Sequence, residues 1–157
     1  MSPAVPETGM TYAVAFDASP LARTALGRAG ELGEATDEAV VAVTCIPDST
    51  ARARENGWVA PGETYDLDGV VDHLQAVVTD VVPAAHFRYE TVAGSARKGV
   101  VNGTLREAVT RMEPDVVFVG SERAGVATPM ESVAGTLLAG GEYDVYLVRD
   151  VDPQYVD

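Results

Sequence analysis

The chain has 157 residues, 46% of them hydrophobic, which fits one folded domain with a sizeable core and excludes a disordered chain. Its 24 acidic and 11 basic residues give a formal net charge of −13. A field of that sign repels nucleic acids and anionic membranes, which argues against both as partners. No apolar run reaches the ~18 residues of a membrane span, so we expect a soluble, cytoplasmic protein.

Three parts are predicted along the chain. Residues 1–10 have no basic stretch and are expected to form a flexible tail rather than a signal peptide. Residues 11–149 are expected to form a single domain, and residues 150–157 an acidic tail. The one lysine is Lys98. High acidity with so little lysine is typical of proteins from salt-loving organisms, whose charges are screened at molar salt, although an ordinary acidic protein has the same balance.

Cysteine and histidine predict neither a disulfide nor a metal site. Cys45 is the one cysteine, so no disulfide can form within the chain, and its apolar neighbours favour a buried, inert thiol over a catalytic one. His73 and His86 lack ligand spacing to a cysteine or an acidic cluster.

Strands and helices are predicted to alternate along the chain. Short apolar runs predict strands, and apolar residues three and four apart predict helices. The first helix has Ser19 as its N-cap and Pro20 in its first position. Residues 47–64 have no clean period and predict a long loop, as do residues 94–102. The predicted elements are a strand at 12–16, a helix at 20–34, a strand at 39–46, a helix at 67–82, a strand at 87–92, a helix at 104–112, a strand at 116–119, a helix from 133 to the glycines at 140–141, and a strand at 145–148.

This order predicts an α/β fold, with a five-stranded parallel sheet and helices on both of its faces. The strand at 87–92 alternates between apolar and polar residues, which suits an edge. The strands at 12–16, 39–46 and 116–119 are apolar throughout, which suits the middle of the sheet. The simplest strand order is therefore 3-2-1-4-5, which is Rossmann-like. In this order the winding reverses between the first and fourth strands, and ligands bind beyond the carboxyl ends of the strands at such a point.

Two separate segments are predicted to meet at that point. Asp17 follows the first strand, and its carboxylate either hydrogen-bonds a ribose or adenine or caps the following helix. Gly120 and Ser121 follow the fourth strand. We expect these residues to face each other across one crevice.

The loop that begins at Gly120 and leads to the helix cap Ser132 is a candidate phosphate site. Backbone N–H groups in such a loop and at a helix N-terminus can hold phosphate, although by its spacing alone the signal is weak. Arg123 is the one cation in the loop, and it either binds phosphate or pairs with Glu122 or Glu131.

The long loop at 47–64 holds Arg52, Arg54 and Trp58, which either cover a bound nucleotide or face solvent. No Walker loop, serine-nucleophile motif or Cys–His pair is present. An enzyme with a covalent intermediate is therefore not predicted, and no catalytic residue is assigned.

Several segments, in this order, match the pattern of a known family. Residues 13–19 (Ala-Val-Ala-Phe-Asp-Ala-Ser) look like a strand followed by D-x-S, and residues 114–121 (Pro-Asp-Val-Val-Phe-Val-Gly-Ser) look like A-D-L-I-V-M-G-S. Ser132-Val133, followed by residues 144–149, looks like S-V and then P-V-L-V-V. Together they resemble the universal stress protein family over residues 10–151. The resemblance implies a fold like that of the adenine nucleotide α hydrolases and a dimer formed through the last strand.

ATP-binding members of that family carry G-x2-G-x9-G-S/T across the phosphate loop. Gly120 matches the first glycine, but Arg123 stands at the second, with Gly125 close by. Glu131 stands at the last glycine, and the gap to Ser132 is two residues shorter than in the motif. The residues on the adenine side match better. The candidate nucleotide-binding residues are Ala15, Asp17, Cys45, Val119, Gly120, Ser121, Arg123, Gly125, Ser132 and Val133.

The resemblance therefore implies a non-catalytic stress-response or regulatory protein with a degenerate nucleotide pocket and no tightly bound cofactor. The alternative is a member that holds ATP or AMP and hydrolyses it slowly or not at all. A different α/β enzyme is disfavoured because no nucleophile–base pair can be named. The strand at 145–148 is an apolar edge, which predicts pairing with a second copy as a homodimer, unless residues 150–157 cover that edge in a monomer.

Overall fold

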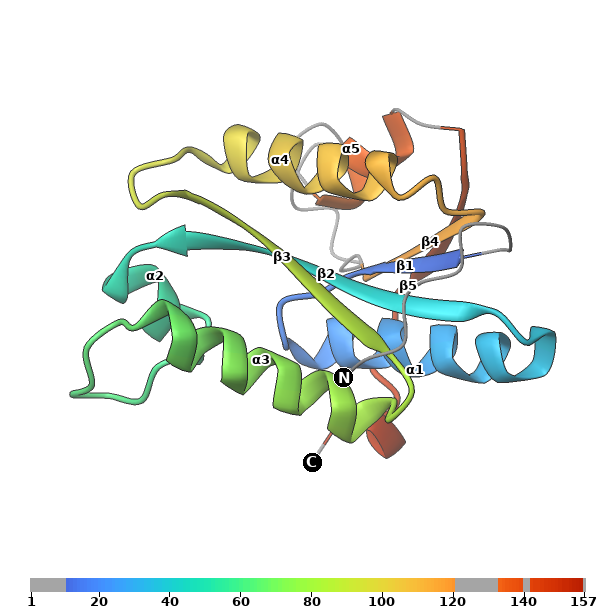
Figure 1. Ribbon diagram of the computed structural model, residues 1–157, viewed down its shortest axis with the longest axis horizontal. Helices are drawn as coiled ribbons and strands as arrows, with labels where there is room; N and C mark the ends of the chain where they lie inside the picture. Colours follow the sequence, from blue (N-terminus) through green and yellow to red (C-terminus); the bar gives the residue numbers. More distant parts are fainter. Residues whose placement is uncertain (1–10, 121–132, 140–141, 157) are drawn as a thin grey trace.

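The computed structural model describes residues 11–120, 133–139 and 142–156. Within these ranges the predicted strands and helices follow in the predicted order, with one further short helix after the second strand, and the helices lie in two layers on either side of a twisted sheet (Figure 1). The elements are β1 (Thr11–Ala15), α1 (Pro20–Thr36), β2 (Ala39–Asp48), α2 (Thr50–Glu55), α3 (Leu67–Val81), β3 (His86–Ala93), α4 (Lys98–Arg111), β4 (Val116–Gly120), α5 (Val133–Ala139), β5 (Asp144–Val148) and a short 3₁₀ turn (Pro153–Tyr155).

The sheet has five strands in the order β3-β2-β1-β4-β5, and every neighbouring pair is parallel. The predicted strand order is thus confirmed. At the centre, Val14 of β1 is in register with Ala42 of β2 on one side and with Phe118 of β4 on the other. The α1, α2 and α3 helices cover one face of the sheet, and α4 and α5 cover the other (Figure 1).

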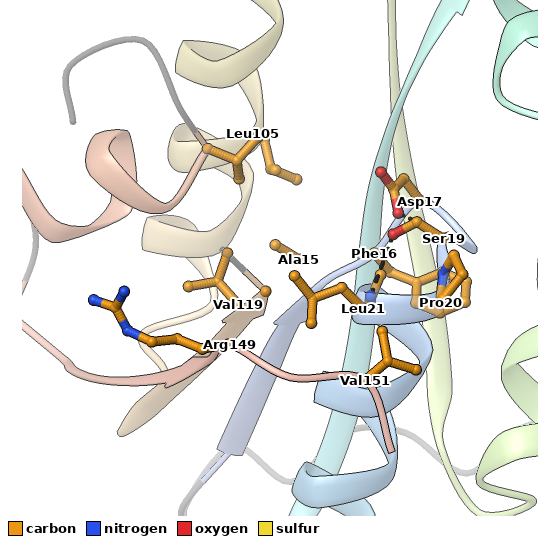
Figure 2. A pocket seen from close by; sticks show the side chains of 13 residues that line it. Ala15, Phe16, Asp17, Ser19, Pro20, Leu21, Leu105, Val119, Arg149 and Val151 are labelled. Carbon is orange, nitrogen blue, oxygen red and sulfur yellow. Dashed lines mark hydrogen bonds between the residues drawn. The ribbon is translucent and has the colours of Figure 1, made fainter. Parts of the chain in front are cut away.

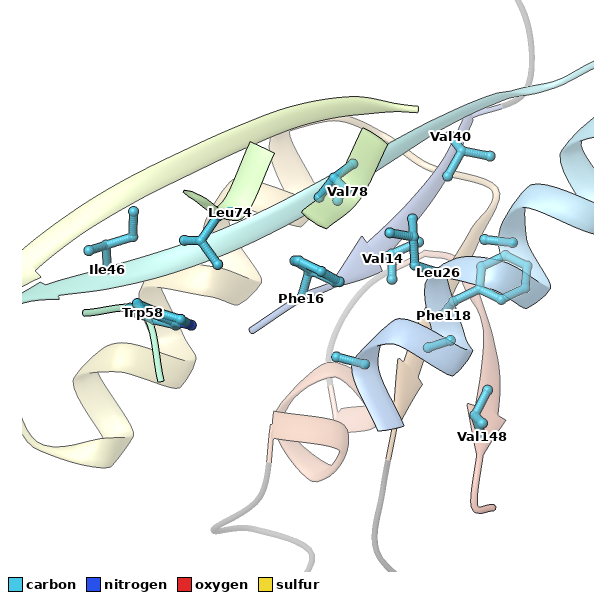
Figure 3. Close-up of a cluster of buried hydrophobic side chains, with 14 of the residues drawn as sticks. Val14, Phe16, Leu26, Val40, Ile46, Trp58, Leu74, Val78, Phe118 and Val148 are labelled. Carbon is cyan, nitrogen blue, oxygen red and sulfur yellow. The ribbon is translucent and has the colours of Figure 1, made fainter. Parts of the chain in front are cut away.

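Each face of the sheet has its own hydrophobic core, because successive side chains of a strand point to opposite faces. The first core joins the α1 and α3 helices to the sheet around Leu26, Leu74 and Phe118, all of them fully buried (Figure 3). The second core joins α4 and α5 to the sheet around Val109 and Leu137. Burial on both faces explains why the central strands are apolar throughout.

The α1 and α3 helices each begin at a side-chain cap. The Ser19 hydroxyl accepts a hydrogen bond from the backbone N–H of Ala22 at 3.2 Å, so Ser19 is the N-cap of α1, with Pro20 as the first helical residue. The Asp66 carboxylate caps α3 in the same way, and the apolar stripe predicted for this helix faces the core.

The segment at 47–64, predicted as a loop, contains the α2 helix and is packed into the fold. The Ser49 side chain caps this helix. Beyond it, Trp58 is only 6% exposed, and its ring N–H donates to the backbone carbonyl of Asp17 at 2.9 Å. A helix of six residues is too short to show a period in the sequence, which is why the prediction missed it.

The α4 helix starts at Lys98, six residues before the predicted start at 104. Its first turn carries Gly99 and the exposed Val100. Helical periodicity is recognised by a buried apolar stripe, and that stripe begins only at Leu105.

The segment after β5 packs against α1. The backbone N–H of Asp152 donates to the Thr24 hydroxyl at 3.0 Å, and the Asp152 carboxylate lies 3.2 Å from the Arg28 guanidinium. The Tyr155 hydroxyl donates to the Glu31 carboxylate. A Cβ atom at residue 27 would lie 2.5 Å from the Tyr155 ring, so Gly27 leaves the room that this ring needs.

Across the helices that the structure describes, none has both the length and the apolar character needed to cross a bilayer.

We predict that Trp58→Ala lowers the free energy of unfolding by about 3–5 kcal/mol, because it removes a buried ring and leaves a cavity. Trp58→Phe keeps most of the ring but loses the bond to the Asp17 carbonyl, so its cost is about 1 kcal/mol. Urea unfolding followed by circular dichroism measures both. A Trp58→Ala variant as stable as the wild type would contradict the described packing of the 47–64 segment.

Candidate functional site

A cavity of about 520 Å³ lies at the carboxyl ends of β1 and β4, where the winding of the sheet reverses (Figure 2). This is the position at which parallel α/β sheets bind ligands. The described residues that line it are Ala15, Phe16, Asp17, Ser19, Pro20, Leu21, Ala22, Leu105, Val119, Gly120, Val133, Arg149 and Val151.

The turn between β1 and α1 is held rigidly at one side of this cavity. Ala18 has a φ of 65°, in the left-handed region that costs a residue other than glycine about 1–3 kcal/mol. Three hydrogen bonds offset this strain. The backbone N–H of Ser19 donates to the Asp17 carboxylate at 2.9 Å, the Thr44 hydroxyl donates to the Phe16 carbonyl at 2.7 Å, and the Trp58 ring donates to the Asp17 carbonyl.

Asp17 is exposed at the cavity, and it is not the cap of α1, because Ser19 fills that role. One oxygen of its carboxylate, Oδ1, accepts from the Ser19 backbone and supports the turn. Since a carboxylate has about four acceptor sites, it can also accept from a ligand hydroxyl or amine.

Gly120 is required by packing between the sheet and α1. A Cβ atom at this position would lie 2.7 Å from Cγ of Leu21, so glycine lets the first turn of α1 approach the end of β4. This reason is independent of any ligand. Leu21 and Val119, the residue before Gly120, both line the cavity.

The walls of the cavity are mostly apolar, and its charged groups lie at opposite sides. Leu105 of α4, Val119 of β4 and Val151 form apolar walls, with Asp17 on one side and Arg149 on the other (Figure 2). Arg149 is the one cation among the described lining residues.

Sequence reasoning missed Arg149 as a site residue. It directly follows β5, as Asp17 closely follows β1. Because parallel strands end at one edge of the sheet, its place after the last strand was a signal that could have identified it.

The structure brings together five of the ten predicted residues: Ala15, Asp17, Val119, Gly120 and Val133 all line the cavity. Four others, Ser121, Arg123, Gly125 and Ser132, lie outside the described residues.

Three further predicted positions lie away from the cavity. Cys45, the tenth candidate, is on β2, is only 8% exposed and belongs to the core under α4. Arg54 donates to the backbone carbonyl of Glu63 at 2.6 Å, and Arg52 is half-buried on the same helix, α2; neither lines the cavity.

The environment of Cys45 makes its thiol unreactive. Burial, and secondarily the negative charge of Glu90 on the neighbouring strand, raises the pKa of the Cys45 thiol to about 11. Only a thiolate is an effective nucleophile or metal ligand. In the part of the chain that the structure describes, no three His, Cys, Asp or Glu side chains gather as a metal site requires.

Comparison with solved structures gives the same fold, whereas no protein family model and no curated protein sequence matches the chain. A universal stress protein in complex with cAMP is 18% identical, with a TM-score of 0.52 over 91% of this chain and 98% of its own. The universal stress protein from Archaeoglobus fulgidus in complex with dAMP is 12% identical, with a TM-score of 0.57 over 90% of this chain and 98% of its own. A member of the family from Burkholderia pseudomallei is 19% identical, with a TM-score of 0.57 over 92% and 99%.

The chain therefore has the fold of the universal stress proteins, a Rossmann-like α/β fold, as its sequence motifs predicted. At these identities the likeness concerns the fold, and the role of each cavity residue has to be argued from its own chemistry.

We predict that Cys45 of the native protein reacts slowly with a thiol reagent such as DTNB at pH 8, because a pKa of about 11 leaves very little thiolate at that pH. Since the folded-state pKa lies above the ordinary value, native stability falls as the pH rises from about 9 towards 11. Unfolding the same protein in guanidinium chloride should release one fast-reacting thiol, which is the internal control. Fast reaction of the native protein would contradict the burial described.

Proposed function

We propose that this protein is a universal stress protein that binds an adenine mononucleotide in the cavity beyond β1 and β4 and acts as a regulatory, non-catalytic dimer. The observation that carries the proposal is the cavity itself. It lies where the winding of the sheet reverses, its walls are mostly apolar, and its few polar groups are well separated. Ligand pockets are typically about 300–1,000 Å³ in volume and have this composition.

The proposed ligand matches the chemistry of the cavity. Ala15, Leu105 and Val119 offer apolar surface to a base, and Asp17 offers a carboxylate to a ribose hydroxyl or an amine. Two proteins of the same fold were solved in complex with cAMP and with dAMP, both adenine mononucleotides. The residues that line their cavities can differ from those of this protein, but the two complexes support an adenine mononucleotide as the class of ligand.

The arrangement of polar groups supports binding rather than catalysis. Ser19 is the one hydroxyl among the described lining residues, and its oxygen accepts from the Ala22 backbone as a helix cap. A serine nucleophile needs an adjacent base, and the imidazoles of His73 and His86 lie on α3 and β3, away from the cavity.

The sequence of the phosphate loop disfavours ATP as the ligand. Glu131 brings a negative charge to a position where ATP-binding members have glycine, and the loop is two residues short; both features fall outside the described residues. Two unit charges about 6 Å apart repel by about 3 kcal/mol at an effective dielectric constant of about 20, which corresponds to about a hundredfold in affinity.

We predict that AMP binds at least about tenfold more tightly than ATP in calorimetric titrations with magnesium at low ionic strength, because a triphosphate brings more negative charge into an acidic loop. Asp17→Ala should weaken AMP binding about tenfold by removing a charged acceptor. Asp72→Ala on the exposed side of α3, which removes the same charge, should have no effect. A low-micromolar dissociation constant for ATP that is lost in Asp17→Ala would overturn the preference. Binding of neither nucleotide would overturn the proposed ligand.

The dimer is proposed from the exposed edge of the sheet. Among the strands that the structure describes, β5 pairs with β4 alone, which makes it an edge strand whose outer backbone groups can pair with a second copy. Tyr146 on this strand is 42% exposed although its ring stacks on Phe118, with ring centroids 4.9 Å apart. The segment after β5 packs on α1 through Asp152 and Tyr155, which supports pairing with a second copy over coverage of the edge by this segment. The family resemblance implies the same interface.

We predict that light scattering at micromolar concentration gives twice the 16.4 kDa mass of one chain. Tyr146→Glu should shift the protein towards the monomer, because it adds a charge to an apolar interface. Tyr89→Glu is the matched control, since Tyr89 is also 42% exposed but lies on β3 at the opposite edge of the sheet. A monomeric mass for the wild type would remove the proposed dimer, and equal effects of the two variants would move the interface elsewhere.

A further inference from the structure

We propose that Arg149 binds the phosphate group of a mononucleotide held in the cavity, so that the ligand lies with its ribose and base towards Asp17 and its phosphate towards the end of β5. This inference rests on the proposed function, because it assumes that the cavity takes a nucleotide. It assigns a phosphate-binding residue outside the loop that follows β4.

The first support is the distribution of charge in the cavity. Among the described lining residues Asp17 is the one acid and Arg149 the one base, and they lie on opposite sides with Val119 and Leu21 between them (Figure 2). A phosphate next to the Asp17 carboxylate would meet a like charge, whereas a guanidinium attracts phosphate and hydrogen-bonds it. The two charges therefore favour one orientation of a ligand with one anionic end.

The second support is that the Arg149 side chain is exposed; its guanidinium points away from Asp17 in Figure 2, so binding requires a change of its side-chain rotamer. The ion pairs that the described arginines form involve Arg28, with Asp152 and Glu31, and Arg111, with Glu90. In a protein with a net charge of −13, a guanidinium at the rim of a cavity is a local site of attraction for an anion.

The third support is that the backbone around Arg149 is fixed at both ends. On one side β5 ends at the buried Val148, which is in register with Gly120. On the other side Asp152 is tied to α1 by its bonds to Thr24 and Arg28. Residues 149–151 therefore cross the cavity rim at a set position, and a ligand has to order only the Arg149 side chain. Pre-organisation of this kind lowers the entropic cost of binding.

The role of Arg149 is tested by comparing AMP with adenosine, which differ by the phosphate alone. In calorimetric titrations at low ionic strength, Arg149→Gln should weaken AMP binding by about tenfold or more and leave adenosine binding within about twofold of the wild type. Arg88→Gln, an equal change of charge at an exposed position on the opposite edge strand, should leave both unchanged. Added salt should weaken AMP binding by the wild type more than by Arg149→Gln.

The outcomes separate the two proposals. If AMP binding is unaffected by Arg149→Gln, or if AMP and adenosine weaken equally, Arg149 does not bind phosphate while the proposed nucleotide site stands. If the wild type binds neither ligand, the proposed function falls, and this inference falls with it. Arg149→Lys, which keeps the charge and loses the planar fork, should retain part of the preference for AMP over adenosine. Urea unfolding of each variant checks that the fold is kept.

Discussion

The parallel pairing of the five strands is the constraint on which the rest of the structure depends, because it brings all their carboxyl ends to one edge of the sheet. β1 and β4 are neighbours at the centre of this sheet, but the chain leaves them on opposite faces: α1 covers one face and α5 the other (Figure 1). The cavity lies at the carboxyl ends of these two strands. Its position follows from the strand order, whereas its chemistry follows from the few residues at that edge.

Three residues at the strand ends give the cavity distinct properties. Asp17 provides an acceptor whose position is set by the strained Ala18 and by bonds that arrive from β2 and from the 47–64 segment. Gly120 provides close contact between the sheet and α1. Arg149 provides a cation at the opposite side. A substitution in the 47–64 segment can therefore reach the cavity through Trp58, although this segment contributes none of the described lining residues.

Much of the fold could be predicted from the sequence because its signals are local. Apolar runs, helical spacing and the Ser19 cap placed the elements, and the polar alternation of β3 identified an edge strand and hence the strand order. The misses have physical reasons. The α2 helix is too short to show a period, and the first turn of α4 lacks a buried stripe. Cys45 was misplaced because β2 is buried on both faces, so its apolar run does not show which face each side chain reaches. Arg149 was missed although its place directly after β5 marked the ligand-binding edge of the sheet.

The attachment of Asp152 and Tyr155 to α1 has a consequence for synthesis on the ribosome. The α1 helix is made well before β4, β5 and the 3₁₀ turn, yet it contacts all three. The space that Gly27 leaves on α1 stays unfilled until Tyr155 has emerged from the exit tunnel and its ring can pack there. Because these contacts join segments far apart in sequence, the core between α1 and the elements it contacts late in the chain can close only after residues 144–155 have been made.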